Sequence, residues 1–311
     1  MKINKVISIA AVLLTVFMFF GGCQESSAPT AAPTATDNGK ADWPAKITIV
    51  QMPDENNPDA GSIHEGFRTE MEEYLGIKIE ELEGSDYTVG IEAMKSGKLE
   101  VLLVSPMSYY QAKRVADIEP LVTTSTNGAV PYKTVFITRS DRDDINSLED
   151  LEGKTFAFVD PASSSGYLYP KTKLVTALEL DPEKLENPNY FFSTVAYSGK
   201  HDSSLMGVVM GDYDAAAVAL QMISGLADAG IINEDDIKII GETDEIPNAC
   251  FVIRADLPQS LKDAIRDFYL QYDDSGYFEA FYGTPDMKFV EVQDSDYDVV
   301  TEMVEILKIE E

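Results

Sequence analysis

The sequence predicts an α/β protein built from two similar lobes. Short apolar runs alternate with segments whose apolar residues recur at helical spacing, which is typical of an α/β fold with mostly parallel sheets. The alternation occurs in both halves of the 311-residue chain, which is long enough for two cores. Two extended runs, 132–138 and 249–253, are predicted to be the crossover strands of a hinge. We expect lobe I to comprise residues 46–131 and 248–311, and lobe II residues 132–247.

The first half supplies three strand and helix pairs. The continuous apolar run 101–104 suits a strand that is covered on both faces, whereas 77–82 alternates apolar and polar residues as a half-buried strand does. Gly76 and Gly97 are natural stops for the helices that precede them. The expected strands are 47–50, 77–82 and 101–104, and the expected helices are 63–75, 87–96 and 108–116.

The second half repeats this plan, with a strand of small apolar residues, 215–220, that leads directly into a helix. The expected strands are 155–159, 215–220 and 237–240, and the expected helices are 167–180, 203–210, a helix from 221, 261–272 and 299–309. Ligands of such sheets lie beyond the carboxyl ends of the strands. The candidate ligand loops are therefore those at Met52, Ser85–Tyr87, Ser105–Met107 and Ser163–Ser165.

The charge of the chain excludes some partners. The chain has 24 basic and 54 acidic residues and a net charge of −30, which argues against nucleic acid or an anionic membrane surface. Asp294, Asp296 and Asp298 alternate along the chain, but the glycine and glutamate of a calcium-binding loop are absent, which favours a solvated acidic face. We expect neither a metal site nor a cofactor.

The N-terminus has the pattern of a secretory signal peptide, residues 1–22. Two lysines precede an apolar run, 6–20, which is short for a membrane span. Phe20-Gly21-Gly22-Cys23 resembles the bacterial lipobox, which implies lipid on Cys23 after cleavage, and residues 23–45 have the composition of a flexible tether. The sequence therefore predicts an extracytoplasmic protein that is anchored to the cell membrane by lipid. Cleavage removes two lysines and no acidic residue, so the net charge becomes −32.

Three consecutive serines lie where a strand turns into a helix. The first N–H groups of a helix lack partners within the helix and carry partial positive charge, and serine hydroxyls add donors beside them. Ser163, Ser164 and Ser165, with Gly166 allowing close approach to the main chain, therefore form a candidate pocket for a small oxyanion. A simpler interpretation is that Ser163 or Ser164 is only the cap of the helix.

Four segments are informative when they are taken together. They are Asp160-Pro161-Ala162-Ser163-Ser164-Ser165-Gly166-Tyr167-Leu168, Ser198-Gly199-Lys200-His201-Asp202, Asp86-Tyr87 followed by Glu92 to Lys98, and Ile246-Pro247. Together they resemble a known family, the substrate-binding proteins of phosphate, phosphite and phosphonate ABC transporters. The family's serine segment has threonine where this chain has Ser164, which keeps the hydroxyl. The resemblance covers about residues 47–270. It implies the two-lobed type II periplasmic-binding-protein fold and an ABC permease as partner.

The resemblance also implies roles for individual residues. The three serines and nearby N–H groups would hold the oxygens of the ligand, and His201 would donate a hydrogen bond to one oxygen or share a proton with it. Tyr87 and Tyr132 would close over the ligand, although both could instead be ordinary core or rim aromatics.

Two positions depart from the family pattern. Gln221 stands where members that bind aminoalkyl phosphonates have an acidic residue, and Asn248-Ala249 stands where members commonly have an aspartate. A protonated amine needs a carboxylate partner in a closed site. We therefore expect that 2-aminoethylphosphonate is not the preferred ligand.

Two other classes of function remain as alternatives. The chain could be a two-lobed binder of another small ligand, such as a sulfonate, a thiamine precursor or an amino acid, because such folds host many ligands. A serine hydrolase is the other class, but no nucleophile elbow, phosphate-binding loop or zinc-protease motif occurs. Ser165 with His201 is conceivable as a nucleophile and base, yet no third member is evident.

Overall fold

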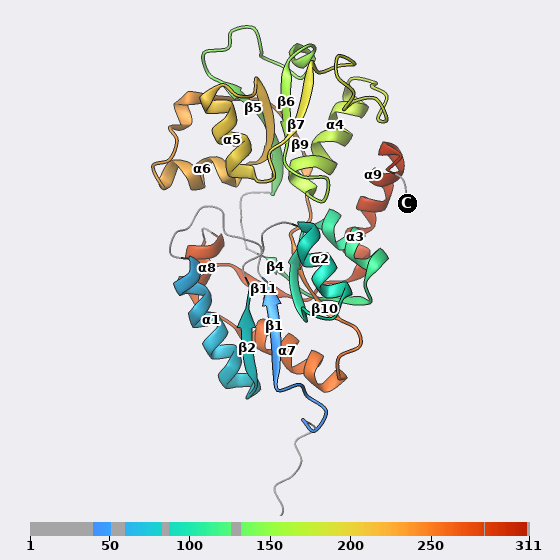
Figure 1. The fold of residues 1–311 in the computed structure, drawn as a ribbon. Helices are drawn as coiled ribbons and strands as arrows, with labels where there is room; N and C mark the ends of the chain where they lie inside the picture. The colour runs from blue at the N-terminus through green and yellow to red at the C-terminus, as the bar shows by residue number, and fades with distance from the viewer. Residues whose placement is uncertain (1–39, 51–59, 83–86, 126–131, 283, 310–311) are drawn as a thin grey trace, which may run out of the picture. The chain divides into compact units, whose positions relative to one another are not determined.

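The computed structural model of the chain describes residues 40–50, 60–82, 87–125, 132–282 and 284–309, with side chains described from residue 64 onward in the first helix. These residues belong to one compact unit, Gly39–Glu311 (Figure 1). Cys23, the signal segment, most of the tether and the predicted ligand loops at Met52 and Ser85-Asp86 lie outside the described residues.

The described residues form two mixed β-sheets flanked by helices. The first sheet has the strand order β11-β4-β10-β3-β1-β2, and the second has the order β7-β6-β8-β5-β9. The strands of the first sheet are β1 (Lys46–Val50), β2 (Lys78–Glu81), β3 (Val101–Val104), β4 (Ile118–Ser125), β10 (Cys250–Arg254) and β11 (Lys288–Val290). Those of the second are β5 (Lys133–Arg139), β6 (Thr155–Phe158), β7 (Thr194–Tyr197), β8 (Ala215–Ala219) and β9 (Ile237–Glu245).

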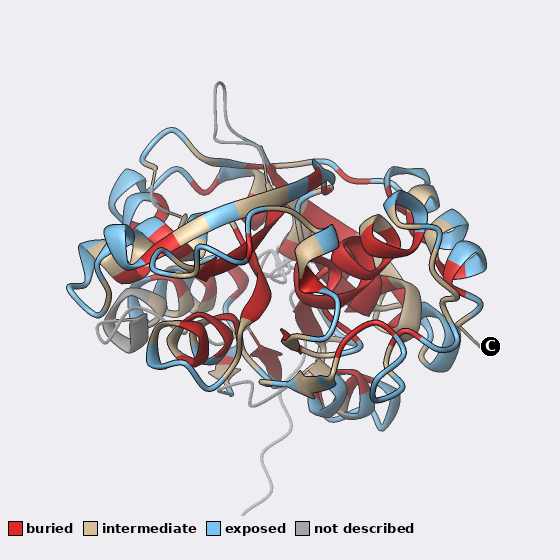
Figure 2. Cartoon of the chain, turned by 90° about the horizontal axis from the view of Figure 1, so that it is seen from above, coloured by how far each residue is buried: buried red, intermediate tan, exposed pale blue. Residues whose placement is uncertain are grey.

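Apolar cores cover both faces of each sheet. The helices are α1 (Ala60–Leu75), α2 (Tyr87–Lys95), α3 (Pro106–Val115), α4 (Tyr169–Ala177), α5 (His201–Met210), α6 (Gln221–Asp228), α7 (Gln259–Gln271), α8 (Ser275–Tyr282) and α9 (Asp298–Leu307). In β3, Val101 and Leu103 face the core shared with α1, α7 and α8, whereas Leu102 and Val104 face the core shared with α2 and α3. Figure 2 shows the resulting pattern, in which the inner strands are buried, whereas loops, outer helical turns and an edge strand are largely intermediate or exposed. Coverage on both faces explains the continuous apolar runs.

The sheets are mixed, so the prediction of mostly parallel sheets is wrong. β1 pairs in parallel with β2 and β3, and β6 does so with β7 and β8. The two predicted crossover strands, β5 and β10, instead lie inside the sheets and run antiparallel to both neighbours. Each of these strands enters from the other sheet, so it does not arrive through the helical crossover that joins consecutive parallel strands.

Four elements were not predicted from the sequence, namely β4, β7, α8 and β11. β4 contains Pro120, a residue that argues against a strand interior, and the register of its pairing with β10 shifts between Phe251 and Val252. β7 and β11 are short edge strands, and β7 lacks the buried alternation that identifies a strand.

The last helix, α9, contacts α3 and also α4, which lies over the second sheet (Figure 1). Val300, Val304 and Leu307 belong to the same apolar core as Phe156 and Phe158 of β6. The C-terminal helix therefore packs on elements that belong to both sheets. The division into lobe I and lobe II stays a prediction.

Other expectations concern single residues and the membrane. Cys250 of β10 is fully buried in the core that lies between the first sheet and α2 and α3. Asp294 is more than a solvated carboxylate, because it accepts hydrogen bonds from Tyr109 Oη and Lys113 Nζ. Within the described ranges no group of acidic, histidine or cysteine residues could hold a metal ion, and none of their helices is long and apolar enough to span a bilayer.

Candidate functional site

The serine turn, residues Ser163–Leu168, follows β6 and leads into α4. Ser164–Leu168 forms a single π-helical turn, wider than an α-turn, before α4 begins at Tyr169. Pro170 has no N–H to donate to the carbonyl of Gly166, and that carbonyl instead accepts from Val159 N at 2.9 Å. The helical segment therefore starts at Ser164, three residues before the predicted start at residue 167. π-turns of this kind occur frequently at functional sites.

Gly166 allows the turn to lie directly against the end of the strand. A Cβ atom on this residue would lie 2.3 Å from Val159 Cβ and 2.4 Å from Val159 Cγ2. Ser163 caps the turn, because its Oγ accepts from Gly166 N at 3.0 Å while its own backbone is extended. Ser163 is therefore the cap of this turn, and its role in ligand binding stays a prediction.

The start of this helix is buried, and two of its main-chain donors are unsatisfied. Ser163, Ser164 and Ser165 are at most 1% exposed. Among the described residues, no acceptor lies within hydrogen-bonding distance of the N–H groups of Ser164 and Ser165. Buried N–H groups at a helix start normally find an acceptor, and an anion is the acceptor that the helix dipole favours.

Two serine hydroxyls connect the turn to other elements. Ser164 Oγ accepts from Met107 N at 2.7 Å, which joins the turn to the start of α3. Ser165 Oγ accepts from Tyr132 Oη at 2.9 Å and lies 3.0 Å from His201 Nε2. The structure thus brings together Ser165, Tyr132 and His201, three residues that lie far apart in the sequence.

The surroundings of His201 determine its tautomer. His201 is the first residue of α5, and its Nδ1 accepts from the main-chain N–H of Ala219 at 3.2 Å. Burial lowers the pKa of His201 to about 4, so the imidazole is neutral at physiological pH. A neutral ring with an accepting Nδ1 carries its proton on Nε2. His201 therefore donates to Ser165 Oγ.

This arrangement does not suit a serine nucleophile. A base that activates a serine needs a free lone pair on the nitrogen that faces the hydroxyl, and a partner that accepts from the other nitrogen. His201 offers a proton to Ser165 instead, and its second nitrogen faces an N–H donor rather than a carboxylate. The pair is built for hydrogen-bond donation.

Residues of α3 meet the turn from the first sheet. Ser105 Oγ and Ser108 Oγ donate to the carbonyl of Ala162 at 3.2 and 2.9 Å, and both serines are buried. The loop Ser105–Met107 was predicted as a ligand loop from the rule that ligands lie at strand ends. The structure places this loop beside the serine turn. Ser108 was missed, although its position three residues after the N-cap serine of α3 is a usable signal.

The family model for periplasmic substrate-binding proteins of phosphonate ABC transporters matches residues 49–297. The chain belongs to this family. It is 28% identical to the phosphate-import protein PhnD of Mycolicibacterium smegmatis over 98% of both chains. It is therefore an extracytoplasmic substrate-binding protein of an ABC importer, as the resemblance implied.

Solved structures show the same two-lobed fold. A binding protein of an ABC phosphonate transporter from Pseudomonas aeruginosa aligns with a TM-score of 0.73 and 22% identity, covering 85% of this chain and 86% of that one. PhnD1 of Prochlorococcus marinus in complex with methylphosphonate aligns with a TM-score of 0.72 and 17% identity, covering 85% and 98%. The predicted two-lobed architecture of the family is confirmed.

The other residues that the family resemblance singled out lie at different places. Tyr87 is the first residue of α2 and is half-buried, and Gln221 is the exposed first residue of α6. Their roles in ligand binding stay predictions. Asn248 lies between β9 and β10 and is bound to two other parts of the chain. Its Nδ2 donates to Thr124 O at 2.8 Å, and its carbonyl accepts from Tyr297 Oη.

Tyr169 is a candidate that sequence reasoning missed. Its Oη is buried, and among the described residues it has no hydrogen-bond partner. Burial is the main cause that raises the pKa of Tyr169, and the nearby Tyr132 and Asp244 raise it further. The phenol therefore keeps its proton. A buried phenol proton beside Tyr132 adds a further donor near the turn.

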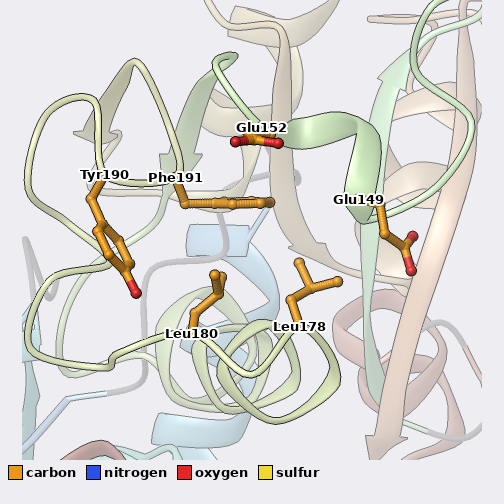
Figure 3. A pocket seen from close by; sticks show the side chains of 6 residues that line it. All are labelled: Glu149, Glu152, Leu178, Leu180, Tyr190 and Phe191. Atoms are coloured by element: carbon orange, nitrogen blue, oxygen red, sulfur yellow. The ribbon is translucent and has the colours of Figure 1, made fainter.

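A surface pocket elsewhere on the second sheet's side has different chemistry. It has a volume of about 370 Å³ and is lined by Glu149, Glu152, Leu178, Leu180, Tyr190 and Phe191. In Figure 3 the ring of Phe191 lies between Glu152 and Leu180, and the carboxylate of Glu149 points away from it. Carboxylates repel an oxyanion, and no lining residue belongs to the serine turn, so this pocket is no candidate for the anion site.

Proposed function

We propose that this protein captures a small phosphorus oxyanion, a phosphonate, phosphite or phosphate, at the serine turn and delivers it to the permease of an ABC importer. The observation that carries the proposal is the buried helix start, where two N–H groups without a partner among the described residues lie beside three serine hydroxyls. Neutral donors of this kind match the oxygens of a tetrahedral anion and require no buried positive charge.

Two lobes would close over the ligand. Ser163, Ser164, Ser165 and His201 would hold it from lobe II, residues 132–247, with Tyr132 at the crossover. Tyr87, from lobe I, residues 46–131 and 248–311, would cover the ligand, and Gln221 would face its substituent. The contact between Met107 N and Ser164 Oγ supports this arrangement, because it joins elements of both sheets beside the turn.

The protein would bind its ligand without chemistry. In support, His201 directs a proton at Ser165 and so does not act as a base toward that hydroxyl.

The protein would be held at the membrane by lipid on Cys23. Labelling with palmitate tests this anchor by comparing the natural chain with a Cys23→Ser variant. Equal labelling of both would contradict the anchor.

A ligand panel tests the function. Methylphosphonate, phosphite, phosphate and methanesulfonate are titrated by calorimetry, and their effects on thermal unfolding are recorded. A phosphorus ligand at a hundred times its dissociation constant should stabilise the folded protein by about 2.7 kcal/mol. A shift by methanesulfonate with every phosphorus compound inactive would favour the sulfonate alternative instead. A phosphonate ester that is cleaved by the protein would establish catalysis.

Two variants locate the site. Ser165→Ala should weaken binding of the phosphorus ligand by at least tenfold, because a hydrogen bond to a charged group contributes about 1.5–3 kcal/mol. Ser224→Ala is the matched control, since Ser224 is exposed on α6 and its Oγ bonds only to Gln221 O in its own helix. Equal affinities for Ser165→Ala and the control would contradict the proposed site.

The same panel tests the choice among phosphonates. We propose that 2-aminoethylphosphonate is not the preferred ligand, because Gln221 and Asn248 carry no charge and the amide of Asn248 is bound to Thr124 O. Tight binding of 2-aminoethylphosphonate, with methylphosphonate and phosphite inert, would overturn this.

A further inference from the structure

Each serine hydroxyl oxygen of the turn already accepts a hydrogen bond from a fixed protein donor. Ser163 Oγ accepts from Gly166 N, and Ser164 Oγ accepts from Met107 N. Ser165 Oγ accepts twice, from Tyr132 Oη and from His201 Nε2. A hydroxyl has two lone pairs and one proton, so the two bonds to Ser165 leave it only its proton to offer. Ser165 is therefore a donor toward any ligand.

The two groups that fill the lone pairs of Ser165 keep their protons over a wide pH range. His201 is locked by Ala219 N–H at Nδ1, and burial lowers its pKa to about 4. Burial raises the pKa of Tyr132, although its hydrogen bond to Ser165 works in the opposite direction. Between pH 5.5 and 9 neither group takes up or releases a proton, so both lone pairs of Ser165 Oγ stay occupied. Ser165 therefore cannot accept a hydrogen bond from the ligand.

The elements packed against the turn bring few charges to it. They are α3, α4, β5 and β8, and His201 joins them from α5. The titratable and charged groups at or beside the turn include the phenols of Tyr132, Tyr167 and Tyr169 and the ammonium of Lys171. Tyr167 and Lys171 are both bound to Glu186, and Asp160, just before the turn, accepts from Ala162 N. The donors of the turn therefore face the ligand without a titrating partner among the described residues.

We propose that the turn binds its oxyanion as the dianion, with three unprotonated oxygens that all act as acceptors. The inference rests on the proposed function and names the ionic form of its ligand. A monoanionic phosphonate, R–PO3H⁻, would set its P–OH proton against the proton of Ser165 or against an N–H of the turn. It could donate only to the second lone pair of Ser163 or Ser164, and its oxygen would then lose the hydrogen bond that this hydroxyl donates to the dianion. Two donors that face each other leave both unsatisfied in a buried site. The monoanion therefore releases its proton to the buffer and binds as R–PO3²⁻.

The consequence is a specific pH dependence. Below the second pKa of the ligand, the observed affinity falls tenfold for each pH unit, because only the dianionic fraction binds. Above that pKa the affinity is constant. A site in which His201 shared a proton with the ligand would show the opposite trend, with binding improved at low pH.

Phosphorus NMR of bound methylphosphonate tests the proposal directly, because the ³¹P shift differs between its monoanion and its dianion. We expect the shift of the bound ligand to stay at the dianion position from pH 6 to 9, while the free ligand titrates. Calorimetry at pH 6 in buffers of different ionisation enthalpy should show release of about one proton per ligand bound. A bound shift that titrates, or uptake of a proton on binding, would overturn the proposal. Absence of binding by every phosphorus compound would instead defeat the proposed function.

Variants at His201 test whether it acts through Ser165 as a positioning residue. His201→Gln keeps an N–H donor, so the bound shift should stay at the dianion position. His201→Leu frees one lone pair of Ser165, so the bound shift should begin to titrate as a P–OH becomes acceptable. Identical bound shifts in the two variants across pH 6 to 9 would contradict the role assigned to His201. Melting temperatures establish that each variant is folded. If His201→Leu does not fold, the NMR and calorimetric experiments on the natural chain still decide the main proposal.

Discussion

Burial determines both the charge and the tautomer of His201. The ring has an N–H donor on one side, from Ala219, and the hydroxyl of Ser165 on the other. A charged imidazolium would have to keep a proton on Nδ1, directly against the Ala219 N–H. The neutral form avoids this clash of donors, which agrees with the lowered pKa.

This lowered pKa predicts how stability depends on pH. The ordinary pKa of 6.5 applies to the unfolded chain, whereas burial gives about 4 in the folded protein. The contribution of His201 is thus complete above pH 6.5 and is lost as the pH falls from 6.5 toward 4, because only the unfolded state takes up the proton. At pH 5 the loss is on the order of 2 kcal/mol.

Urea unfolding of the natural chain and of His201→Gln measures this loss. Carboxylates titrate in both proteins and cancel in the difference between them. The stability of the natural chain relative to the variant should therefore fall between pH 7.5 and pH 5. A difference that stays constant over this range would mean that His201 is not held neutral by burial.

At the scale of elements, the serine turn depends on how closely it approaches β6. The turn and the strand end meet at Gly166 and Val159, where there is no room for a side chain. The carbonyl of Gly166 and the N–H of Val159 then form a hydrogen bond that holds the turn in place. The free N–H groups of the turn keep their direction only while this contact persists.

Gly166→Ala should therefore destabilise the protein by about 1–3 kcal/mol, because the new Cβ overpacks against Val159. It should also weaken ligand binding, since the turn must shift away from the strand. Gly225→Ala is the matched control, because a Cβ at Gly225 in α6 meets nothing within 4 Å. The control should be neutral or stabilising by up to about 1 kcal/mol, as expected for alanine in a helix. Urea unfolding that ranks the two variants equally would contradict the contact.

The elements also show where sequence patterns succeed. β3, β6 and β8 were predicted with bounds close to those of the structure, because strands covered on both faces have continuous apolar runs. β4 and β7 were missed because one contains a proline and the other lies exposed at a sheet edge. Periodicity reports burial, so it identifies a strand only where burial is regular.

At the scale of the whole molecule, the charge of the chain opposes its proposed ligand. The net charge is −30, and the donors of the turn are neutral. Capture of a dianion would therefore depend on local hydrogen bonds that act against a repulsive field. Added salt screens that field over about 10 Å at 0.1 M, while the buried hydrogen bonds at the turn are screened much less.

The affinity for methylphosphonate should therefore rise as salt is added. Between 20 and 200 mM sodium chloride we expect an increase of roughly threefold, because screening removes part of the repulsion. Calorimetric titrations at fixed pH above the second pKa of the ligand measure the change. An affinity that falls steadily with salt would indicate that a positive charge binds the ligand, in conflict with a site of neutral donors.

The sequence was sufficient for the parts of this protein that are encoded locally. The serine turn, the glycine within it and most of the strands and helices can be predicted from neighbouring residues, because backbone preferences and burial patterns act over a few positions. The site residues Ser163, Ser164, Ser165 and His201 were found in this way and through the family resemblance, and their roles in binding stay predictions.

Long-range pairing determined the rest, and no local pattern carries that information. Only the folded chain shows that β5 and β10 lie antiparallel inside the sheets, and that Met107 donates to Ser164. The proton position on His201 likewise depends on Ala219, a residue on another strand. Whether a hydroxyl or an imidazole donates a hydrogen bond to a ligand depends on its other hydrogen-bond partners. Those partners come from distant parts of the sequence.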